Sequence, residues 1–453
     1  MKEKKLSLKN KKIHFIGICG ASMSGLAMHL KNKGFCVTGS DLNPSGVKNL
    51  LEKQNITVFD KHEELNVSDC DAVIYSSAIS QDNIELKFAK NKKIPIFSRS
   101  QLLGEIISEY KKSIAVGGSH GKTTTTAMIA SILVLANKTP TVFLGGESLD
   151  FSNYIFGKGH FAVTEACEYK KNILDLSPYI AVVLNVDNDH LDCYKDMGEL
   201  VETFKKFASG RLTFINADDK YAKEISNQST VTFGVENIAN YMAKDIKRNC
   251  VGYSFSVYAY SIKLGKINLS LMGKHNIYNA LASIAVCDSL KIPFWQIKKA
   301  LENFKGVKRR CEYLGKFSNC ECFADYAHHP EEIRATLCAF NEQNQPFAVV
   351  FQPHTYSRTK ILMDEFVRVL KDINDLIIYQ TYSARESFDE DGSAKKLYDN
   401  LQESSKTEKC FVCTSEQLRQ RLLITTKKYK RILFLGAGDI YDIAKEIIKD
   451  KKD

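Results

Sequence analysis

The sequence predicts an α/β protein with three domains: an N-terminal Rossmann-like domain with a parallel sheet, a central domain with a mixed sheet behind a phosphate-binding loop, and a C-terminal Rossmann-like domain. Three observations predict this class. Strand-like runs alternate with amphipathic segments, a glycine-rich loop joins a strand to a helix near residue 118, and residues 240–272 alternate with a period of two. Because 453 residues exceed one compact core, we expect domains at 1–110, 111–308 and 309–453.

The N-terminal domain shows the pattern of strands connected by helices. Its strand-like runs are KIHFIGI, FCVTGSD, DAVIYSSA and IPIF, and the segment SMSGLAMHLKNKG after the first run has a helical pattern. Strands that are separated by amphipathic helices pair in parallel, because each helix returns the chain to the end of the sheet where the previous strand began. We therefore expect a parallel sheet here.

The central domain opens with SIAVGGSHGKTTTTAMIASILVLA, which predicts a strand, a loop and a helix. Further buried strands are expected in HFAVTEA, YIAVVLNV, RLTFIN and TVTFGV. The alternating segments YSFSVYAYSIKL and INLSLMG predict antiparallel strands appended to the parallel sheet. A helix is expected to begin near HNIYNALASIAVCDSL.

The C-terminal domain repeats the alternation of strands and helices. We expect its strands in CFADY, PFAVVFQ, DLIIYQ, KCFVC and RILFLGAG, with helices between them. The pairs Cys320/Cys322 and Cys410/Cys413 invite a zinc interpretation. A zinc site would need two such pairs at a suitable spacing from each other, and these two are not so spaced. Packing within strands is therefore the favoured interpretation.

Composition is typical of a soluble globular protein, with 44% hydrophobic and 26% charged residues. No run approaches the roughly 18 apolar residues of a membrane span, and the apolar run after the basic N-terminus is too short for a signal peptide. We expect a cytoplasmic protein with no membrane partner.

The net charge of +10 permits anionic partners, but the lysines are scattered, so no nucleic-acid partner is expected.

The segment GGSHGKTTTT departs from the general P-loop formula, because Val116 stands where the first glycine is expected. Its context of strand, loop and helix still favours nucleotide binding. Backbone N–H groups of residues 118–122 can surround a phosphate at the helix N-terminus. Lys122 would reach the β- and γ-phosphates, and Thr123 would offer its hydroxyl to magnesium. The alternative is a tight strand–helix turn without a ligand.

Two further residues at strand ends are candidate magnesium ligands. Glu165 follows one buried strand and His190 follows the next, and ligands gather at the carboxyl ends of parallel strands. Carboxylate oxygen suits magnesium well, whereas imidazole is a less usual ligand for it.

The segment GICGASMSG is a weak dinucleotide fingerprint, because Cys19 and Ser22 replace its second and third glycines. Asp41 ends the second strand, where a ribose-binding acid would stand. This pattern is poor evidence for NAD, but it supports a diphosphate at the helix N-terminus.

In the C-terminal domain, DYAHHPEE and FQPHTYSRT gather polar residues in loops after strands, where function is common. Arg358 could bind a carboxylate through two hydrogen bonds. The paired histidines His328 and His329 also raise zinc as an alternative, for which no third ligand can be placed.

Together these motifs resemble the Mur ligase family over nearly the whole chain. HFIGICGASMSGLA resembles the family's opening, and GSHGKTTTT resembles its loop, which begins at Gly118 and so explains Val116. Further matches, in order, are EACEY, NVDNDHLD, GKHNIYNALA, VKRR, DYAHHPEEI, FQPHTYSRT, YSARE and LGAGDI. The chain departs from the family at Cys19 and Ser22, at Lys61, which replaces a common glycine, and at Ala324, where an acid often stands.

The resemblance implies a P-loop ATPase-type central domain and a ligase that uses ATP and Mg²⁺ to join the lactyl carboxylate of UDP-N-acetylmuramate to L-alanine through an acyl phosphate. Catalytic residues would be Lys122, Glu165 and His190. Magnesium ligands would be Thr123, Glu165 and His190. The family's ATP contacts map to Gly118, Ser119, His120, Gly121, Lys122, Thr123, Thr124, His275, Asn276, Asn279, Arg310 and Asp325.

The same resemblance places the other two substrates in the outer domains. Contacts to the UDP-sugar would come from Gly17, Cys19, Gly20, Ser22, Met23, Ser24, Asp41, Ser76 and Arg99. Contacts to the amino acid would come from His329, His354, Tyr356 and Arg358. Because the residues come from separate domains, we expect closure onto ATP.

Three alternatives stay open. A close relative attaches recycled tripeptide to the same sugar nucleotide, and a generic P-loop NTPase or small-molecule kinase would act without an amino acid. A sensor that kept the fold but lost the chemistry is disfavoured, because Lys122, Thr123, Glu165 and His190 are all present. A monomer and a homodimer are equally compatible with the sequence.

Overall fold

The computed structural model describes residues 11–44, 46–187, 193–249, 252–342, 345–384, 386–404 and 407–449. The chain forms two compact units. One comprises Met1–Leu271 with His275–Gly306, and the other comprises Met272–Lys274 with Val307–Asp453. The first unit contains two sheets and the second contains one, so the predicted class of three α/β domains is confirmed. The exact domain boundaries remain a prediction.

The N-terminal sheet has the strand order β3-β2-β1-β4-β5, and every pair in it is parallel. Its strands are β1 (Lys12–Ile16), β2 (Cys36–Ser40), β3 (Thr57–Phe59), β4 (Ala72–Tyr75) and β5 (Ile96–Ser98). The helices are α1 (Ala21–Asn32), α2 (Val47–Lys53), α3 (Ile84–Asn91) and α4 (Arg99–Ser108), with the 3-10 helix η1 (Glu64–Val67). The order reverses between β1 and β4, which is where such sheets bind ligands.

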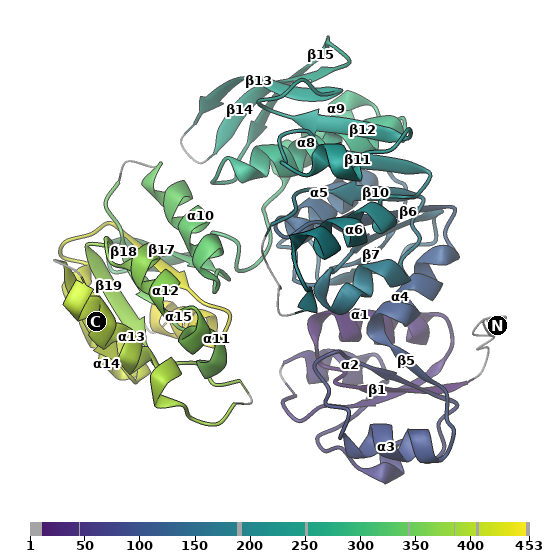
Figure 1. Cartoon of the computed structure of the whole chain (residues 1–453), viewed down its shortest axis with the longest axis horizontal. Coiled ribbons are helices and arrows are strands. Elements are labelled where there is room, and N and C mark those ends of the chain that lie inside the picture. Colours follow the sequence, from purple (N-terminus) through teal and green to yellow (C-terminus); the bar gives the residue numbers. More distant parts are fainter. Residues whose placement is uncertain are drawn as a thin grey trace. The chain divides into compact units, whose positions relative to one another are not determined.

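The central sheet has the order β15-β14-β13-β12-β11-β10-β6-β9-β7-β8. Its strands are β6 (Lys112–Gly117), β7 (Thr141–Phe143), β8 (Tyr154–Ile155), β9 (Phe161–Glu165), β10 (Ile180–Val183), β11 (Leu212–Asn216), β12 (Thr230–Gly234), β13 (Tyr241–Arg248), β14 (Tyr253–Ala259) and β15 (Ile262–Leu269). The appended strands are confirmed: β14 and β15 pair antiparallel, and Figure 1 shows them extending the sheet beyond β12.

The central domain has further helices besides α5 (Lys122–Leu135), whose middle is almost fully buried. They are α6 (Met197–Phe207), α7 (Ala222–Ile225), α8 (His275–Ser289) and α9 (Phe294–Asn303), with the 3-10 helix η2 (Tyr169–Asp175). Helix α8 begins at His275, as its pattern predicts. Both α8 and α9 contact α5, so the helix that follows the glycine loop is held by its neighbours as well as by the sheet.

The second unit has a sheet of order β16-β17-β21-β18-β19-β20, parallel except for the β16–β17 hairpin. Its strands are β16 (Glu312–Phe317), β17 (Cys320–Asp325), β18 (Ala348–Phe351), β19 (Asp375–Tyr379), β20 (Glu408–Val412) and β21 (Arg431–Leu435). The helices are α10 (Pro330–Asn341), α11 (Tyr356–Ile361), α12 (Met363–Leu370), α13 (Ala394–Ser404), α14 (Ser415–Thr425) and α15 (Ile440–Lys449). Cys320 and Cys322 are fully buried in β17, consistent with strand packing. In the part of the chain that the structure describes, no helix is long and apolar enough to cross a bilayer.

A buried histidine on α1 is expected to make the first unit sensitive to acid. His29 is fully buried, its Nδ1 lies 3.1 Å from the Tyr154 hydroxyl, and its ring lies edge-on to Phe143 and Phe156. Burial, and then the charge of Lys33, lower the pKa of His29 to about 4. The unfolded chain takes up this proton near pH 6.5, so the stability that neutral His29 provides is present above that pH and is lost as pH falls toward 4.

We therefore expect the free energy of unfolding to drop by about 3 kcal/mol between pH 6.5 and pH 4 through this residue. The variant His29→Leu keeps a side chain of similar size but cannot titrate. Thermal denaturation across this range should give a flatter profile for the variant than for the unchanged protein. Identical slopes would show that His29 is not responsible.

Candidate active site

The loop between β6 and α5 depends on two glycines with left-handed backbones. Gly118 has φ +136° and Gly121 has φ +84°. A Cβ on Gly118 would lie 3.0 Å from the Leu184 Cβ, and one on Gly121 would lie 2.4 Å from the Asn279 Oδ1. Both the conformation and the space therefore require glycine. The loop ends at the start of α5, where the free N–H groups of a helix favour anions.

The residues after β10 fix the outer part of this loop. Because Val183 is the register partner of Gly117, the segment beyond β10 lies beside the loop beyond β6. Asn185 accepts from the Ser119 N–H at 3.1 Å and from the His120 N–H at 2.8 Å. The Asp187 N–H donates to the Ser119 Oγ at 2.9 Å. These bonds hold Ser119 and His120 in one conformation.

Lys122 makes three hydrogen bonds at the start of α5. Its Nζ donates to the carbonyls of Gly118 and Ser119, and to the Oε1 of Glu168 at 3.0 Å. Glu168 is fully buried. Burial lowers the pKa of Lys122, but the charges of Glu168, Cys167 and Glu165 raise it above its usual value. The lysine is therefore a fixed cation at the loop.

Thr123 and Glu165 form an oxygen pair beside Lys122. The Thr123 hydroxyl donates to the Glu165 Oε2 at 2.8 Å, and the Gly145 N–H donates to the Oε1 at 2.5 Å. Glu165 reaches the loop because it is the register partner of Val116 in β6. A hydroxyl and a carboxylate are hard oxygen ligands, which fit Mg²⁺. His190, the third expected ligand, lies outside the described residues.

The start of α8 lies behind the same loop. Asn279 accepts from the Thr125 hydroxyl at 3.2 Å and donates to the Asn276 Oδ1 at 2.9 Å. The Asn276 Nδ2 lies 3.3 Å from the His275 Nε2. The structure thus brings the three expected residues of α8 together. Both asparagines are buried, and Asn279 connects α8 to α5 through Thr125. Thr124 lies in the first turn of α5.

The first loop of the N-terminal sheet is held by the end of β2. The Ser40 carbonyl accepts from the N–H groups of Gly17 and Ile18, at 2.8 and 3.2 Å. The Asp41 Oδ2 accepts from the Cys19 N–H at 3.0 Å. Asp41 directly follows β2, and its carboxylate fixes the loop; its contact with the ribose remains a prediction.

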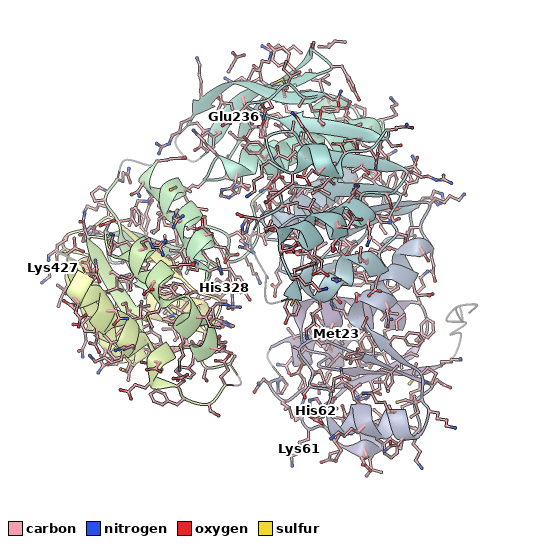
Figure 2. The ribbon with its side chains drawn as sticks, viewed as in Figure 1. Met23, Lys61, His62, Glu236, His328 and Lys427 are labelled. Atoms are coloured by element: carbon pink, nitrogen blue, oxygen red, sulfur yellow. The ribbon has the colours of Figure 1, made fainter. Side chains whose placement is uncertain are left out.

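The remaining expected UDP-sugar residues surround α1. Arg99 donates to the Ser22 Oγ at 3.0 Å, and the Ser76 N–H donates to the Ile16 carbonyl. Met23 (labelled in Figure 2) and Ser24 are buried on α1, at 2% and 1% exposed, and the Ser24 N–H donates to the Gly20 carbonyl at 2.9 Å. Gly20 is the N-cap of α1 and has no side chain to cap it.

In the second unit, several residues that are expected to bind the amino-acid substrate lie after β18. The His354 Nδ1 lies 3.0 Å from the Arg358 Nη1, and its ring stacks on Tyr382 at 5.5 Å. Burial, then His328 and Arg358, lower the pKa of His354 to about 4, so it is neutral beside the guanidinium. Tyr356 packs edge-on against Phe388.

Three other expected residues of this unit lie around β17 and α10. Asp325 is buried and accepts from the N–H groups of Cys311 and Ala327 at 2.8 and 2.9 Å. The Arg310 guanidinium lies 5.6 Å from the Tyr326 ring. His329 is the N-cap residue of α10.

The sequence analysis missed Glu168 and Asn185 as site residues. Glu168 lies in EACEY, three positions after Glu165, and a second carboxylate so close to a candidate metal ligand was an available signal. Asn185 opens NVDNDHLD, next to the strand end, but nothing in its position indicates a bond to His120.

Three segments of the chain match the domains that define one group of enzymes. Residues 12–111 match the Mur ligase family, catalytic domain; residues 116–287 match the Mur ligase middle domain; residues 309–438 match the Mur ligase, glutamate ligase domain. The fold and the phosphate loop define an ATP-dependent ligase, and the chain belongs to the Mur ligase family.

Relatives that match this chain over nearly its whole length carry the name of one enzyme of that family. A UDP-N-acetylmuramate–L-alanine ligase from Acetivibrio thermocellus is 42% identical, over 98% of this chain and 97% of the relative. One of the same name from Clostridium beijerinckii is 40% identical, over 97% and 98%. The crystal structure of the UDP-N-acetylmuramate–alanine ligase from Thermotoga maritima matches with a TM-score of 0.83 and 30% identity, over 97% of this chain and 99% of that one.

Proposed function

We propose that the protein joins the lactyl carboxylate of UDP-N-acetylmuramate to the amine of L-alanine and converts ATP to ADP and phosphate. The observation that carries this proposal is the 42% identity, over 98% of the chain, to a ligase of that name. The reaction belongs to peptidoglycan precursor synthesis. We place it in the cytoplasm, carried out by a monomer or a homodimer without a nucleic-acid or membrane partner.

The phosphate loop supports the first chemical step. The substrate carboxylate would attack the γ-phosphorus of ATP to give an acyl phosphate and ADP. Lys122 and the N–H groups at the start of α5 would bind the phosphate oxygens as charge builds on them. Thr123, Glu165 and His190 would hold magnesium, which when bound neutralises phosphate charge. Glu168 would keep the Lys122 ammonium in place.

The other two sites would hold the substrates that form the amide. The loop at Gly17–Gly20, Asp41 and the Arg99–Ser22 pair would bind the UDP-sugar. In the second unit, Arg358 would bind the alanine carboxylate, because its guanidinium is positively charged and can donate two parallel hydrogen bonds to a carboxylate. The neighbouring His354 is neutral and lies 3.0 Å from this guanidinium. The alanine amine then attacks the acyl carbon, and phosphate leaves.

The proposal predicts phosphate release that requires both partners. With ATP and Mg²⁺, the purified protein should release phosphate only when UDP-N-acetylmuramate and L-alanine are both present, and the product should contain the new amide. Release that ignores both compounds would leave a nucleotide-hydrolysing P-loop protein. If the protein binds nucleotide but releases no phosphate under any of these conditions, the result would favour a sensor that kept the fold and lost the chemistry.

The second candidate is the ligase that attaches recycled tripeptide. A murein peptide ligase from Psychrobacter arcticus has the same fold, with a TM-score of 0.73 at 22% identity over 97% of this chain. That likeness concerns the fold alone, whereas eight relatives at 38% to 42% identity carry the alanine-ligase name. Competition between L-alanine and the free tripeptide as acceptor decides between the two.

A further inference from the structure

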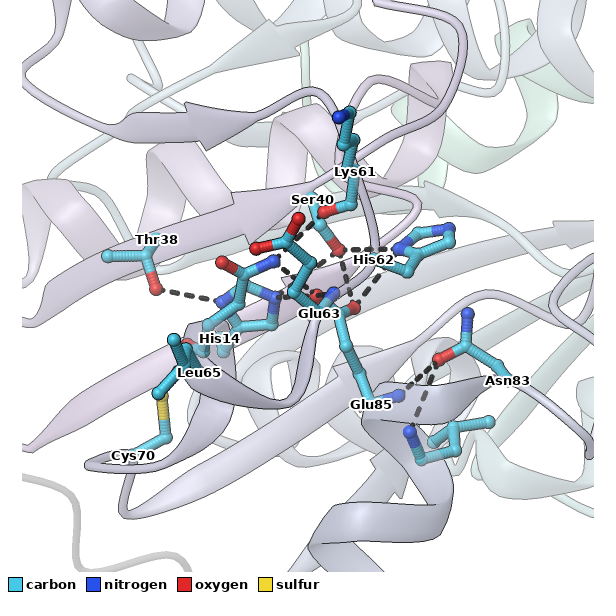
Figure 3. A network of polar contacts seen from close by, with 12 residues as sticks. His14, Thr38, Ser40, Lys61, His62, Glu63, Leu65, Cys70, Asn83 and Glu85 are labelled. Atoms are coloured by element: carbon cyan, nitrogen blue, oxygen red, sulfur yellow. Dashed lines mark hydrogen bonds and ion pairs between the residues drawn. The ribbon is translucent and has the colours of Figure 1, made fainter.

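A buried polar cluster in the N-terminal sheet consists, apart from Ser40, of side chains that lie outside the candidate site. We call it the Glu85 cluster; its members are His14, Thr38, Ser40, His62, Asn66 and Glu85 (Figure 3). Glu85 and His14 are fully buried. Such a group of titratable side chains is costly to bury, so each member must be well paired.

Glu85, at the start of α3, is the centre of the cluster. Its Oε2 accepts from the Ser40 hydroxyl at 2.6 Å and lies 3.1 Å from the His62 Nδ1. Its Oε1 accepts from the Asn66 Nδ2 at 2.7 Å and lies 3.6 Å from the His14 Nε2. Burial raises the pKa of Glu85, but the neighbouring His14, His62 and Ser40 lower it overall, so the group is a carboxylate.

Ser40 connects this carboxylate to the loop expected to bind the UDP-sugar. Its side chain bonds to Glu85, while its carbonyl accepts from the N–H groups of Gly17 and Ile18. The next residue, Asp41, binds the Cys19 N–H. Three successive N–H groups of the loop therefore donate hydrogen bonds to Ser40 and Asp41.

His62 and Asn66 connect the same carboxylate to the segment after β3. The Asn66 Nδ2 also donates to the Lys61 carbonyl at 2.9 Å, and the Glu63 N–H donates to the Glu85 Oε1 at 3.3 Å. Side chains from the middle of β1, the end of β2 and the segment after β3 therefore all lie close to the Glu85 carboxylate.

From this arrangement we infer that Glu85 is a positioning residue for the UDP-sugar site: it touches no substrate but fixes, through Ser40, the loop at Gly17–Cys19. The inference rests on the proposed function. A loop held in its binding conformation pays less ordering entropy when the ligand arrives. Loss of the carboxylate should therefore weaken binding of the sugar nucleotide, while the ATP loop, which belongs to another sheet, keeps its geometry.

The test compares Glu85→Gln with Asp69→Asn. Asp69 forms an exposed ion pair with Lys12, which begins β1 at the opposite edge of the same sheet. For Glu85→Gln we expect the KM for UDP-N-acetylmuramate to rise about tenfold, with kcat and the KM for ATP within about twofold of the unchanged protein. Asp69→Asn should leave all three constants unchanged. Equal changes in the constants for both substrates, or no change, would overturn the inference.

A second variant covers the case in which Glu85→Gln does not fold. Ser40→Ala removes only the hydroxyl that connects Glu85 to β2, and it should raise the same KM in the same direction. An unchanged KM in Ser40→Ala, with a cooperative melting transition, would overturn the inference.

Calorimetry separates this inference from the proposed function. If the unchanged protein shows no alanine-dependent turnover, the proposed function fails, and titration with UDP-N-acetylmuramate alone then decides about Glu85. Weaker binding by Glu85→Gln than by Asp69→Asn supports the positioning role. Equal binding by the two variants, or no binding by the unchanged protein, overturns it.

Discussion

Lys122→Ala is expected to lower kcat/KM by about 1,000-fold or more, because it removes a fixed cation from the transferring phosphate. In the structure this ammonium is bound to two loop carbonyls and to Glu168, so water cannot easily take its place. Phosphate release in the presence of ATP, UDP-N-acetylmuramate and L-alanine measures the loss. Near-normal turnover would contradict the role proposed for the loop.

The same variant should also be less stable, and a double variant separates the two effects. Breaking the buried Lys122–Glu168 pair is expected to cost about 3 kcal/mol, which lowers the melting temperature. Lys122→Met combined with Glu168→Gln removes both charges and should regain most of that stability without regaining activity. If the double variant melts as low as Lys122→Ala, the ion pair is not the cause of the lost stability.

Gly121→Ala is expected to raise the KM for ATP about tenfold and to lower the melting temperature. At φ +84° an alanine costs about 1–2 kcal/mol in backbone energy. Its Cβ would also lie 2.4 Å from the Asn279 Oδ1. Asn279 cannot move away without disturbing its bonds to Thr125 and Asn276. The loop must therefore shift, together with Lys122.

Gly34→Ala is the matched control for this prediction. Gly34 has φ +92°, close to that of Gly121, but no atom lies within 4 Å of its added Cβ. It should therefore show the loss of stability that comes from the backbone alone, with the KM for ATP unchanged. A similar KM increase in both variants would mean that the contact with Asn279 has no part in nucleotide binding.

The sequence predicted the three-domain class because strands and helices alternate with clear periods in each part of the chain. It did not predict β3, β7 or β8, which are two or three residues long and show no period. The hairpin strand β16 was also missed, since GKF and the turn that follows it give no clear alternation. Short strands depend on partners elsewhere in the chain more than on their own residues.

For the site, the sequence could identify the loop but not all of its partners. Gly118 to Thr123 are consecutive, so their pattern alone indicates a phosphate loop. Glu168 is 46 residues from Lys122 and reaches it only through the pairing of β9 with β6. Asn185 depends likewise on the pairing of β10 with β6. Which strands become neighbours in this sheet does not follow their order in the chain, so the local pattern of each strand does not reveal these contacts.

The ends of the ten-stranded central sheet have a consequence for self-association. An open sheet of this width presents two rows of unpaired backbone groups on which another chain could build. Here β8 spans only two residues, and β15 carries Lys263 and Lys266 on either side of a register shift against β14. A short terminal strand at one side, and charge with a bulge at the other, leave no long flat template. Edge-to-edge pairing between copies through this sheet is therefore disfavoured.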